Sequence, residues 1–242
     1  MKISKLQTLW IILVSIFYTI DAFGRAVIKN LIGTISRSWV DKAAHVYVER
    51  ILNLVRVSCR VYNPNQVEPQ PNVPTIIMCN HSSVYDIPLS YKAFPKHSIR
   101  MLAKKELSRI PIMGSGMRAC EFLFIDRKNR RQAIKDLEQV DMLLQSGIVL
   151  WIAPEGTRSK NGKLAPFKKG CFITAINTKA TIIPMGIKGA FNILPARTLQ
   201  LNINQQAEIH IGKPIDASKF TLENKELLIS DVYNSINQLI SD

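Results

Sequence analysis

The sequence predicts an α/β fold, in which helices flank a mostly buried mixed sheet and a hydrophobic, amphipathic helical segment comes first. Two observations predict this fold. Short continuous apolar runs, typical of buried strands, occur at residues 75–79, 148–153 and 181–187. Apolar residues at helical spacing precede the second run and stop at Gly147, as expected at the end of a helix; they are Ile134, Leu137, Val140 and Leu144.

Residues 1–60 are expected to form a membrane-associating helical segment, and residues 61–242 a single globular domain. From Leu9 to Ile20, ten of twelve positions are apolar, whereas a spanning helix needs about 20 such residues. Apolar residues continue to Ile32 but are interrupted by charges, which favours an interfacial or re-entrant helix pair. A single spanning helix and a cleaved signal peptide are the alternatives.

Residues 41–60 are also predicted to be an amphipathic helix. Its apolar positions, which would face the core, are Ala44, Val48, Ile51, Leu52 and Val55. Its arginines, which could reach membrane phosphates, are Arg50, Arg56 and Arg60.

Composition favours a negatively charged membrane surface as a partner. The chain carries 32 basic and 18 acidic residues, a net charge of +14, and 47% of its residues are hydrophobic. Nucleic acid would suit the same charge, but the sequence has neither zinc-finger spacing nor an RNA-binding aromatic motif, so we expect no nucleic-acid partner. The four cysteines and four histidines are scattered, which predicts a reducing compartment and no metal site.

The remaining elements follow from local patterns. Residues 63–74 are rich in proline and predict a turn-rich lead into the strand at 75–79. Alternating apolar residues predict further strands at 199–203 and 207–211, and residues 222–240 are expected to form a closing helix. Ligand sites in α/β sheets gather at the carboxyl ends of strands, and polar clusters follow apolar runs at three places in this chain.

The first cluster runs from Asn80 to Asp86, directly after the strand at 75–79. A helix that starts here would bring Asp86 back to the ring of His81. The carboxylate would then fix the imidazole tautomer, while the other ring nitrogen takes a proton from an alcohol. The pair by itself is weak evidence, because a capping histidine and a solvated aspartate could have the same spacing.

The second and third clusters are rich in groups that bind phosphate. An apolar strand ending at Ile125 is followed by Asp126 and Arg127, and the planar guanidinium of Arg127 suits an anionic head group. Lys104 is a similar candidate. After the strand at 148–153 comes Pro154-Glu155-Gly156-Thr157-Arg158-Ser159, where glycine permits a tight turn and Thr157, Arg158 and backbone amides can donate to phosphate oxygens.

Taken in order, these clusters resemble the sequence blocks of the glycerolipid acyltransferase family, which includes the 1-acylglycerol-3-phosphate acyltransferases. Asn80 to Asp86 resembles the family's N-H-x-x-x-x-D block, Phe124 to Arg127 its F-I-D-R block, and Pro154 to Ser159 its P-E-G-T-R-S block. Ile182 to Met185 resembles the fourth, proline-containing block. One departure is Glu121, which stands where such proteins often carry glycine.

The resemblance implies a membrane-associated acyltransferase domain over residues 61–242. It implies that His81 is the catalytic base and Asp86 its partner, and that Lys104, Arg127 and Arg158 bind the acceptor phosphate beside Glu155, Gly156 and Thr157. The implied reaction moves an acyl chain from acyl-coenzyme A or acyl carrier protein to the sn-2 hydroxyl of lysophosphatidic acid. The product is phosphatidic acid for phospholipid biosynthesis, and no bound cofactor is needed.

The sequence leaves other functions open. The acceptor could be another lysolipid or glycerol 3-phosphate, and a non-catalytic membrane-binding protein would share the basic surface and the amphipathic N-terminus. We expect an active site that faces the cytoplasm, at the inner membrane if the source is bacterial.

Overall fold

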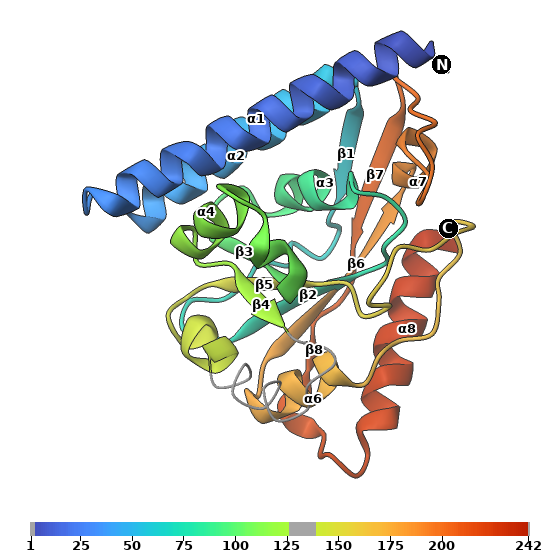
Figure 1. Ribbon diagram of the computed structural model, residues 1–242. Helices are drawn as coiled ribbons and strands as arrows, with labels where there is room; N and C mark the ends of the chain where they lie inside the picture. The colour runs from blue at the N-terminus through green and yellow to red at the C-terminus, as the bar shows by residue number, and fades with distance from the viewer. Residues whose placement is uncertain (1–2, 126–138, 242) are drawn as a thin grey trace.

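A mixed sheet forms the centre of the protein in the computed structural model, which describes residues 3–125 and 139–241 (Figure 1). The strands lie in the order β1-β7-β6-β2-β5-β3-β4, with β8 beside β6. Their bounds are β1 Ser58–Tyr62, β2 Thr75–Cys79, β3 Ile99–Lys104, β4 Leu123–Ile125, β5 Val149–Ile152, β6 Thr181–Lys188, β7 Gln206–Ile211 and β8 Ile215–Asp216. The pairs β2–β5, β2–β6, β3–β5, β3–β4 and β1–β7 are parallel, whereas β6 pairs with β7 and β8 antiparallel.

Helices cover both faces of this sheet. Their bounds are α1 Lys5–Leu31, α2 Arg37–Leu54, α3 Asp86–Ala93, α4 Met113–Ala119, α6 Gly170–Asn177, α7 Ala190–Ile193 and α8 Lys225–Ser241, and residues 139–145 are also helical. Side chains on β2 alternate between the faces, as in any strand. Ile77 belongs to the core that includes α2 and α3, and Ile76 to the core that includes α6 and α8. The prediction of an α/β fold with a mixed sheet is confirmed.

The N-terminal helix α1 is long and mostly solvent-facing. It runs unbroken over 27 residues and begins with a capping box formed by Ser4 and Gln7. It packs along α2, where Thr19 Oγ1 lies 3.1 Å from Tyr47 Oη, and against α4. A Cβ on Gly116 of α4 would lie 2.4 Å from Cβ of Phe23, so the close approach of α4 to α1 depends on glycine at this position.

Several predicted elements have different bounds or a different structure. The expected interfacial pair within residues 9–32 is one continuous helix, α1. The second helix begins at Arg37 and ends at Leu54, so residues 58–60 belong to β1 instead. That strand crosses the boundary that we placed between residues 60 and 61. Ile134 and Leu137 lie outside the described residues.

The strand predicted at 199–203 is wrong. Residues of this segment lie beside α7, where the backbone N–H of Asn202 donates to Ile193 O at 2.8 Å. The alternation of leucines arises because Leu199 and Leu201 face a cleft, described below, rather than one side of a sheet. The strand at 207–211 is confirmed as β7, and the closing helix as α8.

Candidate active site

The side chains of His81 and Asp86 meet just beyond the carboxyl end of β2. Asp86 is the first residue of α3, and its Oδ2 lies 2.8 Å from Nδ1 of His81. The same oxygen accepts hydrogen bonds from the backbone N–H groups of Ser82 and Ser83, at 2.7 and 2.8 Å. Asp86 is fully buried, so the helix start and the carboxylate hold the imidazole in place. Nε2 is then the ring nitrogen available to another molecule.

The His81 ring also packs against an aromatic side chain. The indole of Trp151, on β5, meets the ring edge to face, with centroids 5.8 Å apart. Trp151 Nε1 donates to Ser90 Oγ at 2.8 Å, and that hydroxyl donates to Asp86 O at 2.7 Å. The sequence reasoning missed this support, although the apolar run at 148–153 contains Trp151.

Glu155 ties the first and third sequence clusters together. Its Oε1 accepts the backbone N–H of His81 at 2.7 Å, and its Oε2 accepts the backbone N–H of Ala165 at 2.9 Å. Its side chain is buried, and this burial raises the pKa of the Glu155 carboxyl although both backbone donors act in the opposite direction. A further bond runs from Ser159 N to His81 O at 2.7 Å, so the two loops hold each other.

A cleft of about 1100 Å³ opens in front of His81. Its walls are largely apolar and come from α1, α2, α3, α4 and the ends of the central strands. Lys104, Gly156, Thr157 and Arg158 line the same cleft as His81. Gly156 has a φ of 72°, a left-handed conformation that glycine adopts without strain. The structure therefore brings four of the six predicted substrate-binding residues to the histidine.

Of the other two predicted substrate-binding residues, the structure describes only Glu155. Glu155 lies behind the cleft wall, with its carboxylate oxygens bonded to backbone as described above. Arg127 and its neighbour Asp126 fall outside the described residues. Within the described ranges, no group of three or more His, Cys, Asp or Glu side chains could hold a metal ion.

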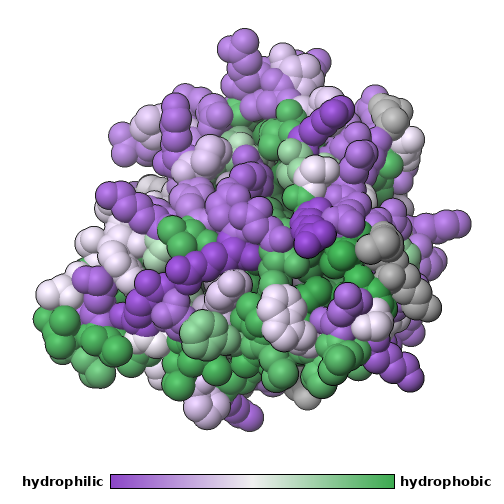
Figure 2. Space-filling view, turned by 90° about the horizontal axis from the view of Figure 1, so that it is seen from above, coloured by the Kyte–Doolittle hydropathy of each residue, from purple (hydrophilic) through white to green (hydrophobic). Residues whose placement is uncertain are grey.

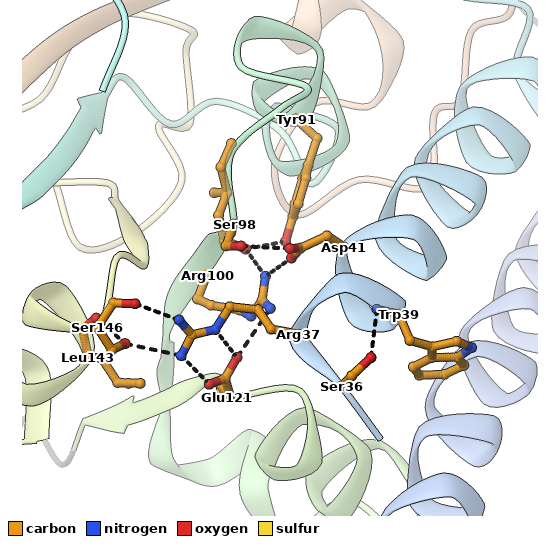
Figure 3. Close-up of polar contacts among 11 residues, drawn as sticks. Ser36, Arg37, Trp39, Asp41, Tyr91, Ser98, Arg100, Glu121, Leu143 and Ser146 are labelled. Atoms are coloured by element: carbon orange, nitrogen blue, oxygen red, sulfur yellow. Dashed lines mark hydrogen bonds and ion pairs between the residues drawn. The ribbon is translucent and has the colours of Figure 1, made fainter. Parts of the chain in front are cut away.

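A cluster of four charges joins α2 to β3, which lines the cleft (Figure 3). Arg37 donates to both carboxylate oxygens of Glu121, at 3.0 and 2.6 Å, and to Ser146 O at 2.6 Å. Arg100, with a side chain 1% exposed, donates to Asp41 Oδ1 at 2.7 Å and to Glu121 Oε2 at 3.3 Å. Since Arg100 lies on β3, which ends at Lys104, the cluster ties the N-terminal helices to a cleft-lining strand.

This cluster explains the unusual residue at position 121. Glu121 has a φ of 63°, a left-handed conformation that costs an ordinary residue roughly 1 to 2 kcal/mol. Its bidentate bond to Arg37 offsets that cost, and glycine, which avoids the cost, could not supply the carboxylate. No local pattern in the sequence predicts this contact, because Arg37 and Glu121 are 84 positions apart.

Comparison with known proteins decides the family. The family model described as Acyltransferase matches residues 58–188, which run from the first residue of β1 to the last of β6. The chain belongs to the acyltransferase family. The matched part includes His81, Asp86, Lys104 and Arg158, so every cleft-lining residue predicted from the sequence lies within the family domain.

Individual relatives share this part of the chain. A 1-acyl-sn-glycerol-3-phosphate acyltransferase of Cocos nucifera is 38% identical over 130 residues, which are 52% of this chain and 42% of the relative. A chloroplastic 1-acyl-sn-glycerol-3-phosphate acyltransferase of Arabidopsis thaliana is 31% identical over 151 residues, which are 62% of this chain and 42% of the relative. The chain thus spans about half the length of the curated relatives it matches.

A solved structure shares the whole architecture of this acyltransferase. The crystal structure of the 1-acyl-sn-glycerophosphate acyltransferase PlsC from Thermotoga maritima aligns with a TM-score of 0.77. The alignment covers 96% of this chain and 92% of that one, at 24% identity. The likeness includes the N-terminal helices as well as the sheet, because only a small part of this chain is left out.

Proposed function

We propose that the protein transfers an acyl chain from a thioester to the sn-2 hydroxyl of 1-acylglycerol 3-phosphate and so forms phosphatidic acid. The observation that carries this proposal is the His81–Asp86 pair at 2.8 Å, placed in a large apolar cleft that also presents Lys104 and Arg158. The cleft suits a molecule with long apolar chains and an anionic head. The named activities of the relatives from Cocos nucifera and Arabidopsis thaliana support this choice.

The chemistry follows from the free ring nitrogen. Nε2 of His81 takes the proton of the acceptor hydroxyl as its oxygen attacks the thioester carbonyl. The C–S bond then breaks, the thiolate leaves and takes that proton from the imidazolium, and an ester remains. Asp86 stabilises the imidazolium without accepting its proton. No acyl-enzyme forms, and the thioester of coenzyme A or acyl carrier protein is a co-substrate, so the proposal includes no bound cofactor.

The acceptor phosphate is assigned to the cationic side chains on the β3 and β5 side of the cleft. Lys104 ends β3 and Arg158 follows β5, and both line the cleft with Gly156 and Thr157. Guanidinium, ammonium and hydroxyl groups all donate to phosphate oxygens, whereas the backbone N–H of Gly156 already donates to Ala153 O at 3.0 Å and shapes the turn. Glu155 acts as a positioning residue in this proposal, because it bonds the backbone of His81 rather than lining the cleft.

The N-terminal helices are proposed to bind an anionic phospholipid surface. Among the described residues, α1 is the one helix with the length and composition to cross a membrane. Figure 2 looks at the side on which α1 lies and shows a broad hydrophobic area beside hydrophilic side chains. The exposed apolar residues of α1 include Leu6, Leu9, Trp10, Leu13, Phe17, Ile28 and Leu31.

A helix that lies on the membrane fits these contacts better than one that crosses it. Helix α1 touches α2 near Thr19 and α4 at Phe23, and one side of it between Thr8 and Phe23 lines the cleft. A spanning orientation would draw the catalytic domain into the hydrocarbon together with α1. The net charge of +14 favours the anionic cytoplasmic leaflet, so we place the active site on the cytoplasmic side, at the inner membrane if the source is bacterial.

The test is turnover with a panel of acceptors. Purified protein in vesicles is incubated with an acyl-coenzyme A and with lysophosphatidic acid, another lysophospholipid or glycerol 3-phosphate, and thiol release and lipid products are measured. Phosphatidic acid formed from lysophosphatidic acid alone supports the proposal. Turnover with another acceptor changes the substrate, and vesicle binding without turnover of acyl-coenzyme A or acyl carrier protein indicates a binding protein. The His81→Ala variant should lose at least 10²- to 10⁴-fold in turnover.

A further inference from the structure

Among the described residues, three cationic side chains line the cleft, and one of them has no role in the function proposed above. They are Lys104, Arg158 and Arg197. Within the described part of the chain, none of the three takes part in an ion pair or a side-chain hydrogen bond. By contrast, Arg25, Arg37 and Arg100 are bonded to carboxylates. An unpaired guanidinium on the wall of an apolar cleft is available for an anion on a bound molecule.

Arg197 lies on the opposite side of His81 from the other two cations. The sheet order places β5 and β3 on one side of β2, and β6 and β7 on the other. Lys104 ends β3 and Arg158 follows β5, whereas Arg197 lies in the connection from α7, which follows β6, to β7. The acceptor and the thioester must reach His81 together. The two flanks of the histidine therefore suit the two different substrates.

The segment that carries Arg197 is fixed to the catalytic loop. Ser83, within the loop from His81 to Asp86, donates from Oγ to Leu194 O at 2.8 Å. On the far side, the Asn202 side chain donates to Asn192 O at 2.6 Å. The backbone of Arg197 itself has a φ of 62°, a left-handed conformation that disfavours a long side chain. Such an outlier is a reason to look for a functional role.

The chemistry of the donor matches this position. Acyl-coenzyme A and acyl carrier protein share a phosphopantetheine arm, whose thiol carries the acyl chain and whose far end carries phosphate. Leu194, Leu199 and Leu201, from the same chain segment as Arg197, also line the cleft and offer apolar surface to the arm. Arginine's planar fork suits phosphate oxygens. We infer that Arg197 binds the phosphate of the donor's phosphopantetheine arm; this inference rests on the proposed function.

The experiment compares donors that have or lack the phosphate. Steady-state kinetics are measured with lysophosphatidic acid in vesicles and with acyl-coenzyme A, acyl carrier protein or the acyl thioester of N-acetylcysteamine, which has no phosphate. Arg197→Ala should raise the donor KM roughly 10- to 100-fold, as expected for losing hydrogen bonds to a charged group. It should leave kcat/KM for the N-acetylcysteamine thioester and the KM for lysophosphatidic acid unchanged.

Lys179→Ala is the matched control. Lys179 is also exposed and has a φ of 51°, but it does not line the cleft, so this variant also removes one positive charge and creates a left-handed alanine. The control variant should leave KM and kcat/KM unchanged for every donor.

The outcomes separate the inference from the function that it rests on. A raised KM with coenzyme A, with the carrier protein or with both supports the inference and identifies the source of the phosphate. The inference is overturned if Arg197→Ala lowers kcat/KM equally for the N-acetylcysteamine thioester. It is also overturned if the variant raises only the KM for lysophosphatidic acid or weakens only the binding to vesicles. If the unaltered protein turns over no donor, the proposed function fails. If the unaltered protein is active and Arg197→Ala has the same KM for each donor, only the inference fails.

Discussion

The charge cluster of Figure 3 makes a strong prediction about stability. Glu121→Gln keeps the size of the side chain but removes its charge. It weakens the two bonds from Arg37 and the one from Arg100, and the buried Arg100 keeps only Asp41 as a charged partner. Removing one partner of a buried ion pair costs about 3 to 5 kcal/mol. Because the Glu121 side chain is 30% exposed, we expect about 2 to 3 kcal/mol.

The assay is thermal melting in detergent. For a domain of this size, each kcal/mol lowers the melting temperature by roughly 2 to 4 °C, so Glu121→Gln should melt roughly 4 to 12 °C lower. Glu68→Gln is the control, since Glu68 pairs with His97 at 2.9 Å through a side chain that is 52% exposed. An exposed pair contributes about 0 to 1 kcal/mol, and the control should melt close to the unaltered protein.

The difference in melting temperature between the unaltered protein and Glu121→Gln should increase from acidic to neutral pH. The hydrogen bond from Arg37 lowers the pKa of Glu121 below its ordinary value of 4.5. A carboxyl whose pKa is lower in the folded state stabilises the fold fully above its unfolded pKa, and this contribution is lost as pH falls through the folded pKa. The melting gap between the unaltered protein and Glu121→Gln should therefore be widest near neutral pH and narrow below about pH 4.5.

Two results would refute this reasoning. One is a gap at neutral pH no larger than that of Glu68→Gln, and the other is a gap that does not narrow in acid. Backbone strain gives a separate check. Glu121→Gly should be about 1 kcal/mol more stable than Glu121→Ala, because only glycine adopts the left-handed conformation freely.

Further predictions concern the catalytic pair and the helix contact. Asp86→Asn should lower kcat by roughly 10²- to 10⁴-fold with little change in secondary structure, because the amide cannot stabilise the His81 imidazolium; normal thiol release would count against the pair. Glu155→Gln should destabilise the fold by about 1.5 to 3 kcal/mol, because the new side-chain NH2 group would face a backbone N–H that now donates to a carboxylate oxygen. An unchanged melting temperature would argue against the positioning role. Gly116→Ala should lower both melting temperature and turnover by displacing α1, whereas Gly170→Ala, with open space around it, should lower neither.

Local patterns were enough to predict much of the architecture. Buried strands such as β2 and β5 are visible as apolar runs, and a helix that begins near Asp86 brings this residue back to His81 after five positions. Sequence periodicity failed at 199–203, because residues that face a cleft can alternate like those of a strand.

Contacts between distant segments could not be predicted from one sequence. Nothing near Arg100 indicates that its guanidinium is buried, since its partner Asp41 comes from a helix 59 positions earlier. The strand β3 that carries Arg100 was also missed, because its run from Ile99 to Lys104 contains two cationic residues. Long-range ion pairs of this kind offset the free-energy cost of burying a charge. A buried strand can therefore contain charged residues, and a hydrophobicity pattern does not identify it.

Helix α1 lines the cleft and, among the described residues, carries more exposed large apolar side chains than any other element. If this helix lies in the membrane, lipids enter and leave the active site sideways and never pass through water. The relevant acceptor concentration is then a surface density. At a fixed donor concentration, adding buffer to vesicles of fixed composition would leave the rate per enzyme unchanged, whereas adding inert lipid at a fixed amount of acceptor would slow it, as expected for an enzyme that works in two dimensions.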